Sequence, residues 1–112
     1  MSLELNTIVK DGITVIEFIG NLDTNTAPEA ESVINIQLAE GVGKIILNLG
    51  KTNYVSSAGL RVFLATAKKM TASGGAVKLC SPNPVVREIL DISGFSTILD
   101  VKETEDEALS AL

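Results

Sequence analysis

The residues best suited to chemistry are two adjacent serines, Ser56 and Ser57, in the segment Tyr54–Leu60 (YVSSAGL). Apolar residues recur at helical spacing after this segment, so the two hydroxyls stand where a helix is expected to begin. The first backbone N–H groups of a helix lack partners within the helix, and this end carries a partial positive charge. Such a position accepts a phosphate readily, and Gly59 lets another chain approach closely. A serine here can equally well cap the helix, so the spacing alone leaves both roles open.

Enzyme chemistry of the common kinds is excluded by the residue types that the chain lacks. There is no histidine, which removes Ser-His-Asp and Cys-His catalysis and histidine-based zinc sites. The single cysteine, Cys80, permits neither an internal disulfide nor a CxxC motif, and we expect it to be a small buried residue at a strand end. The phosphate-binding motif GxxxxGK[ST] is also absent. The sequence therefore predicts a protein that is not an enzyme and needs no cofactor or metal.

Length and charge predict a single domain spanning residues 1–112. The chain has 112 residues, 46% of them hydrophobic, and a formal net charge of -5. Its nine lysines and arginines are scattered, which argues against direct nucleic-acid binding. The longest stretch without a charge, Thr52–Leu60, is far short of the roughly 20 residues that span a membrane. Glu4 and the lack of an apolar segment beside it argue against a secretory signal, so we expect a cytoplasmic protein without membrane insertion.

The hydrophobic pattern predicts the elements that position the serines. Strands are expected at 3–9, 13–19, 44–49, 76–80 and 97–101, the first two joined by a tight turn at 11–12. Helices are expected from a cap at Thr26 to Gly41 or Gly43, from the serines to Gly74, from Pro84 to Gly94, and from a cap at Thr104 to the end. Segment 50–55 reads as a connector. The order β-β-α-β-α-β-α-β-α predicts an α/β domain whose mixed sheet carries helices mainly on one face.

Three stretches in order resemble the anti-sigma factor antagonists, which are bacterial STAS domains. They are Gly20–Ala27 (GNLDTNTA), Ile45–Leu49 (IILNL) running into Tyr54–Leu60, and Gly74-Gly75 followed by Leu79–Val86 (LCSPNPVV) and Leu90–Phe95. The resemblance covers nearly the whole chain and implies a STAS fold. It also implies a partner switch. The unmodified antagonist binds an anti-sigma factor, which is itself a serine kinase, and so frees a sigma factor. Phosphorylation of one serine ends this binding, and a serine phosphatase restores it.

Aligned on Gly59-Leu60, the resemblance implies that Ser57 is the phosphoacceptor, with Ser56 as the alternative. Family members often carry Asp where this chain has Ser56, and Gly where it has Arg61, whose cation could pair with a phosphate. Asp23 matches an acidic loop residue that the family places near the acceptor, although an Asp here could simply order the turn before the helix. The partner-binding residues expected from the resemblance are Asp23, Thr24, Asn25, Ser56, Ser57, Ala58, Gly59 and Arg61.

A second hypothesis uses the same surface without modification. In it the chain is a STAS docking module of a membrane lipid-transport or stress-sensing assembly, and the serine is never phosphorylated. The small residues at the helix start suit both hypotheses, whereas the paired serines favour the switch.

Overall fold

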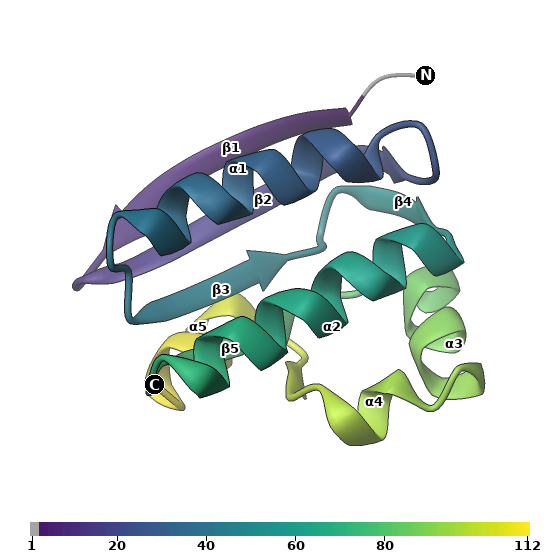
Figure 1. Ribbon diagram of the computed structural model, residues 1–112. Helices are drawn as coiled ribbons and strands as arrows, with labels where there is room; N and C mark the ends of the chain where they lie inside the picture. Colours follow the sequence, from purple (N-terminus) through teal and green to yellow (C-terminus); the bar gives the residue numbers. More distant parts are fainter. Residues whose placement is uncertain (1–2) are drawn as a thin grey trace.

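The computed structural model describes residues 3–112, which form a six-stranded sheet with helices on both faces (Figure 1). The strands follow the order β1-β2-β3-β5-β6, and β4 pairs with the far end of β2. Only β1 runs antiparallel to its neighbour, so the sheet is mixed, as the sequence predicts. Their bounds are β1 Leu3–Lys10, β2 Ile13–Leu22, β3 Lys44–Asn48, β4 Thr52–Val55, β5 Ala76–Cys80 and β6 Val101–Lys102.

Helices cover the two faces of the sheet unequally. The large core lies between the sheet and α1, α2, α3 and α4, whereas α5 alone packs on the opposite face against Val15, Ile46 and Cys80 (Figure 1). The prediction of helices mainly on one face is therefore confirmed. The bounds are α1 Ala27–Ala39, α2 Ser57–Ala72, α3 Pro84–Ile92, α4 Phe95–Ile98 and α5 Glu105–Ser110.

The β1–β2 hairpin turns at Asp11 and Gly12, both of which have positive φ, as the sequence predicts for a two-residue turn. The prediction that one side of this first strand is buried is only partly correct. Leu3 is buried, but Val9 on the same side of β1 is 69% exposed. The core thus lies under only the first part of this strand.

Two expectations about the elements are wrong. Segment 97–101 is not a strand, because α4 takes residues up to Ile98 and β6 contains only Val101 and Lys102. Gly94, with a φ of 80°, turns the chain into α4, and the Thr97 hydroxyl donates to the Gly94 carbonyl oxygen. Conversely, segment 50–55 was expected to be a connector, but most of it is strand β4. This strand forms because it pairs with the end of β2, which is distant in sequence.

Helix ends and caps follow the sequence more closely. α1 and α2 stop just before Gly41 and Gly74, which take the left-handed conformation. Thr104 caps α5 through its hydroxyl, which accepts from the Glu107 N–H. None of the helices described in residues 3–112 is long and apolar enough to cross a membrane.

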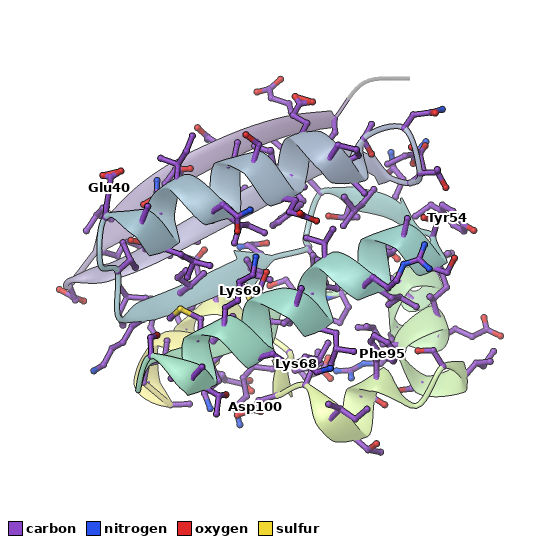
Figure 2. All side chains as sticks on the ribbon, viewed as in Figure 1. Glu40, Tyr54, Lys68, Lys69, Phe95 and Asp100 are labelled. Atoms are coloured by element: carbon purple, nitrogen blue, oxygen red, sulfur yellow. The ribbon has the colours of Figure 1, made fainter. Side chains whose placement is uncertain are left out.

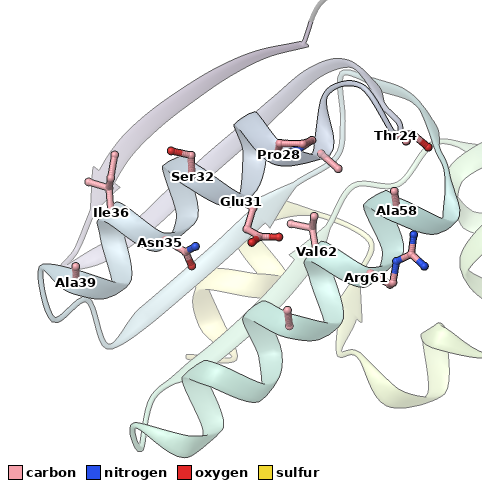
Figure 3. A pocket seen from close by; sticks show the side chains of 12 residues that line it. Thr24, Pro28, Glu31, Ser32, Asn35, Ile36, Ala39, Ala58, Arg61 and Val62 are labelled. Carbon is pink, nitrogen blue, oxygen red and sulfur yellow. The ribbon is translucent and has the colours of Figure 1, made fainter.

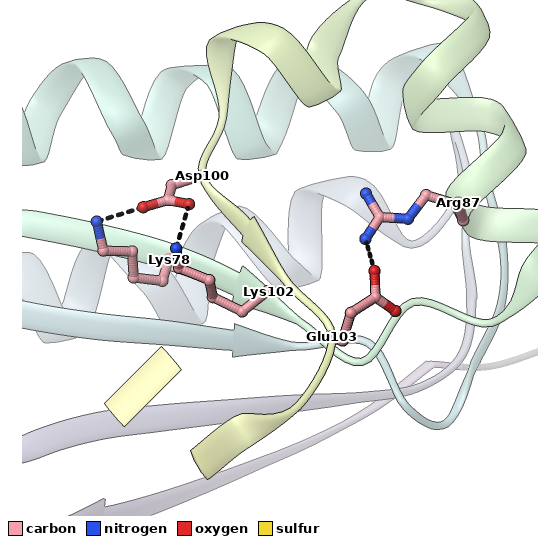
Figure 4. Close-up of polar contacts among 5 residues, drawn as sticks. All are labelled: Lys78, Arg87, Asp100, Lys102 and Glu103. Carbon is pink, nitrogen blue, oxygen red and sulfur yellow. Dashed lines mark hydrogen bonds and ion pairs between the residues drawn. The ribbon is translucent and has the colours of Figure 1, made fainter. Parts of the chain in front are cut away.

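Ion pairs join the C-terminal segment to β5 and α3 (Figure 4). Asp100 contacts both Lys78 and Lys102, and Glu103 contacts Arg87. Hydrogen bonding from Lys78 is the main cause that lowers the pKa of Asp100 below its usual value. These pairs lie at the surface and add little to stability individually.

Candidate functional site

The start of α2 is anchored to the end of β2. Leu22 lies opposite Val55 in the parallel pair of β2 and β4, and the next residue, Ser56, donates its backbone N–H to the Leu22 carbonyl oxygen at 2.9 Å. The loop at 23–26 leaves β2 immediately after Leu22. Residues 23–25 and 56–61, which are predicted to form the site, are separated by the 30 residues 26–55 in sequence, and the sheet brings them side by side.

The two serines have different environments. Ser56 is half-buried and is the N-cap of α2, because its hydroxyl oxygen accepts from the Gly59 N–H at 3.4 Å. Ser57 is the first residue of α2 and is exposed. Within residues 3–112, no hydrogen bond of its hydroxyl is found. Ser56 therefore caps α2, whereas the adjacent Ser57 presents its hydroxyl to solvent.

The loop before α1 is fixed by its own side chains. Asp23 Oδ1 accepts from the backbone N–H groups of Asn25 at 2.9 Å and Thr26 at 3.1 Å. The Thr26 hydroxyl donates to the Asn21 carbonyl oxygen at 2.8 Å and accepts from the Asp23 N–H. Asp23 thus orders the turn before α1, which is the second of the two roles expected for this residue. Thr26 precedes α1 as expected, but its hydroxyl is used within the loop and makes no side-chain cap.

Gly59 does not serve the purpose suggested by the sequence. It is buried, and an added Cβ would lie 2.8 Å from side-chain atoms of Leu22 and Val55 and 2.9 Å from the Leu22 carbonyl oxygen. The missing side chain lets α2 pack against its own sheet rather than against a second chain. The expectation that Gly59 makes room for a partner is therefore corrected.

A groove of about 850 Å³ runs between α1 and α2 (Figure 3). From the predicted site it includes Thr24, Ala58 and Arg61, which Figure 3 shows together at one end. The α1 side was missed by the sequence analysis. Its lining residues are Ala27, Pro28, Glu31, Ser32, Asn35, Ile36 and Ala39. The sequence did contain a signal for the α1 side, since Ile36 does not fit the apolar spacing of α1. In the structure this side chain is 55% exposed.

Arg61 lies one helical turn after Ser57 on the exposed surface of α2. Among the residues that the structure describes, its guanidinium has no ion-pair partner. Ser57, Ala58 and Arg61 therefore form a short surface of small side chains beside a single cation. Asn25 and Thr24 lie exposed on the neighbouring loop.

The sequence profile of the STAS domain matches residues 4–108, nearly the whole length of the chain. The chain belongs to the STAS domain family. A STAS relative from Bordetella bronchiseptica, BtrV, named as an anti-sigma factor antagonist, is 35% identical over 111 residues, which cover 99% of this chain and 94% of that protein.

Solved structures agree with this assignment of the STAS fold. A crystal structure described as an anti-sigma factor antagonist from Thermotoga maritima has a TM-score of 0.90 and 25% identity, and covers 96% of this chain and 92% of that one. The anti-sigma factor antagonist SpoIIAA in its unphosphorylated form has a TM-score of 0.79 and 25% identity, with 97% and 94% covered.

The remaining Cys, Lys and Asn side chains of interest in this STAS domain lie apart from the start of α2. No group of three metal-ligating side chains is found in residues 3–112. Burial raises the pKa of the Cys80 thiol to about 11, so this cysteine is a poor nucleophile. Lys68 and Lys69 lie on the exposed side of α2, where Lys69 donates to Asn35 of α1 (Figure 2). Asn48 has a structural role, since its side chain donates to Glu105 and accepts from the Gly50 N–H.

Proposed function

We propose that this STAS domain is an anti-sigma factor antagonist that acts in the cytoplasm as a binding protein and not as an enzyme. The names of BtrV and SpoIIAA, and their similarity over nearly the whole chain, support this role. In the unmodified state the chain binds an anti-sigma factor and so releases a sigma factor. The proposed contact surface is the loop at 23–25 together with Ser56, Ser57, Ala58 and Arg61.

The switch is phosphorylation of Ser57 by the anti-sigma factor acting as a serine kinase, and a serine phosphatase reverses it. The observation that carries this assignment is the difference between the two serines. The Ser57 hydroxyl is exposed and is not used by the fold, whereas the Ser56 hydroxyl caps α2. Modification of Ser56 requires loss of that cap, so Ser57 is the better acceptor.

A phosphate on Ser57 prevents binding through the interface and leaves the fold intact. It adds about 1.5 to 2 negative charges at neutral pH, at a helix end where an anion is stabilised. Arg61, one turn further along, can form a charge-assisted hydrogen bond to it. A partner packed against Ser57 and Ala58 has to desolvate this charge, which is costly unless it supplies its own cation.

Capture of the tagged protein from its own cells, followed by mass spectrometry, tests the proposal. The expected result is an anti-sigma factor with a serine kinase domain, and a single phosphate on Ser57 in the fraction that does not bind it. Recovery of a membrane transport or stress-sensing assembly, with both serines unmodified, would instead support the static docking module. A phosphate on Ser56 alone would move the switch to that residue.

A further inference from the structure

The outer edge of β1 is a long strand edge without a partner. No strand in residues 3–112 pairs with it, and β1 has eight residues in continuous register with β2 (Figure 1). It contains no proline and no bulge, which are common means of blocking an exposed edge. Ile8 and Val9 are 38% and 69% exposed. Such an edge is a template for strand addition.

The direction of the free backbone groups follows from β2. Three even-numbered residues of β2 use their backbone groups on the side of β4. The Gly20 N–H donates to the Lys51 carbonyl oxygen, the Phe18 carbonyl oxygen accepts from the Thr52 hydroxyl, and the Leu22 carbonyl oxygen accepts from the Ser56 N–H. The odd-numbered residues of β2 therefore point toward β1, where they face its even-numbered residues in the register. Consequently the odd-numbered residues of β1 direct their N–H and C=O groups outward.

We propose that a second copy of this chain pairs antiparallel with this edge, around a two-fold axis at Thr7. In this register Thr7 lies opposite Thr7, Leu5 lies opposite Val9, and all of them direct their free backbone groups across the interface. Glu4 of each copy lies opposite Lys10 of the other, so the same charge pair occurs twice. A two-fold contact has this reciprocity by necessity. The strand is thus complementary to itself in hydrogen bonding, apolar surface and charge.

A neighbouring register that also matches the outward backbone groups is less favourable. Pairing centred one residue earlier, at Asn6, places Glu4 opposite Ile8 and leaves the carboxylate without its cation. The charges therefore select the register at Thr7, because opposite charges facing one another stabilise a strand pair.

The dimer leaves the α2 part of the proposed switch surface free. β1 is at one end of the strand order and its outer edge faces away from β2, whereas α2 packs against β4 and β5. Lys10 already contacts Glu105 of α5, and in the dimer this lysine lies between two carboxylates. The inference is independent of the proposed function, since it needs neither an anti-sigma factor nor a phosphate.

Sedimentation velocity of the full chain over a range of concentrations, with hydrogen exchange at high concentration, tests the pairing. We expect a concentration-dependent dimer and protection of the Leu5, Thr7 and Val9 amides only in that dimer. Thr7→Pro removes an outward N–H that β2 does not use, so it should abolish dimerisation and leave the monomer folded. A protein that stays monomeric throughout, or a dimer that tolerates Thr7→Pro, would overturn the proposal.

A charge exchange tests the register directly. Glu4→Lys places two lysine pairs across the interface, and Lys10→Glu places two glutamate pairs there. Each variant alone should dimerise at least about tenfold more weakly, because opposed like charges destabilise a strand pair. Mixing the two variants should restore dimers, since both cross-strand pairs are again of opposite sign. Glu29→Lys, which changes the charge on α1, is the control and should dimerise as the unmodified chain does. If mixing restores nothing, the register is wrong.

Discussion

The 2.9 Å hydrogen bond from the Ser56 N–H to the Leu22 carbonyl oxygen joins the first residue after β4 to the last residue of β2. It fixes where α2 begins relative to the loop at 23–26. Ser57 therefore takes its position from the sheet through this junction. A modification of its hydroxyl can change the surface without disturbing the junction.

Alanine substitution of each serine should separate capping from switching. Ser56→Ala removes the bond to the Gly59 N–H and should cost about 0.5–1 kcal/mol, at the low end for a cap because that bond is long. Ser57→Ala removes no bond found in the structure and puts a better helix former in α2, so stability should change by no more than about 0.5 kcal/mol. Thermal or urea unfolding measures both. Phosphorylation by the cognate kinase should be lost in Ser57→Ala and kept in Ser56→Ala, and the reverse pattern contradicts the assignment.

Binding to the anti-sigma factor should distinguish two substitutions of Ser57. Ser57→Ala removes one hydroxyl and should weaken binding by at most about 0.5–1.5 kcal/mol. Ser57→Asp places a carboxylate beside Ala58, where the partner has to desolvate it, and should weaken binding more. Aspartate has less charge than a phosphate, so the loss is expected to be partial. Calorimetry of both variants decides the matter, and equal affinity of Ser57→Asp and the unmodified chain would place the partner elsewhere.

Gly59→Ala should destabilise the junction itself. The new Cβ meets the Leu22 carbonyl oxygen at 2.9 Å, and backbone cannot move aside as a flexible side chain can. The expected loss is about 1–3 kcal/mol, as for overpacking in a core. Gly43→Ala is a matched control, because a Cβ there meets nothing within 4 Å, and it should stay within about 0.5 kcal/mol. Similar melting temperatures for the two variants would show that α2 can shift without cost.

The sequence predicts most of the sheet because its strands have local signals. The turn at Asp11-Gly12 and the apolar run at 45–47 need no tertiary information to be recognised. Strand β4 had no such signal, and the local strand signal at 97–101 was misleading. The first is a strand because β2 extends past β3 and offers a free edge, and the second follows the left-handed turn at Gly94. Both depend on what lies next to them in space.

The geometry of the candidate site was predictable to a similar extent. The resemblance indicated two stretches of the chain, and the structure brings them together at the Leu22–Ser56 contact. The roles of single residues were not predictable in the same way. Whether Ser56 or Ser57 caps α2, and whether Gly59 faces outward or inward, depends on the exact start of the helix. A one-residue shift of that start would exchange the two serines.

The ion pair between Lys10 and Glu105 predicts a pH dependence of stability. Hydrogen bonding from Lys10, followed by a smaller contribution from Asn48, lowers the pKa of Glu105 below its usual 4.5. Because the folded pKa is the lower one, the stabilisation is present above about pH 4.5 and is lost as the pH falls through the lowered pKa of Glu105. Glu105→Gln should cost at most about 1 kcal/mol at neutral pH, since the pair lies at the surface.

The difference between Glu105→Gln and the unmodified chain should narrow as the solution is made acidic, because both side chains are then uncharged. Glu107→Gln is the matched control: it removes one negative charge from the same turn of α5, at an exposed residue without an ion pair to Lys10. Urea unfolding of the three proteins at a series of pH values measures the effect. A gap for Glu105→Gln that stays constant down to the acid limit would mean that the lost stability does not come from the charge of Glu105.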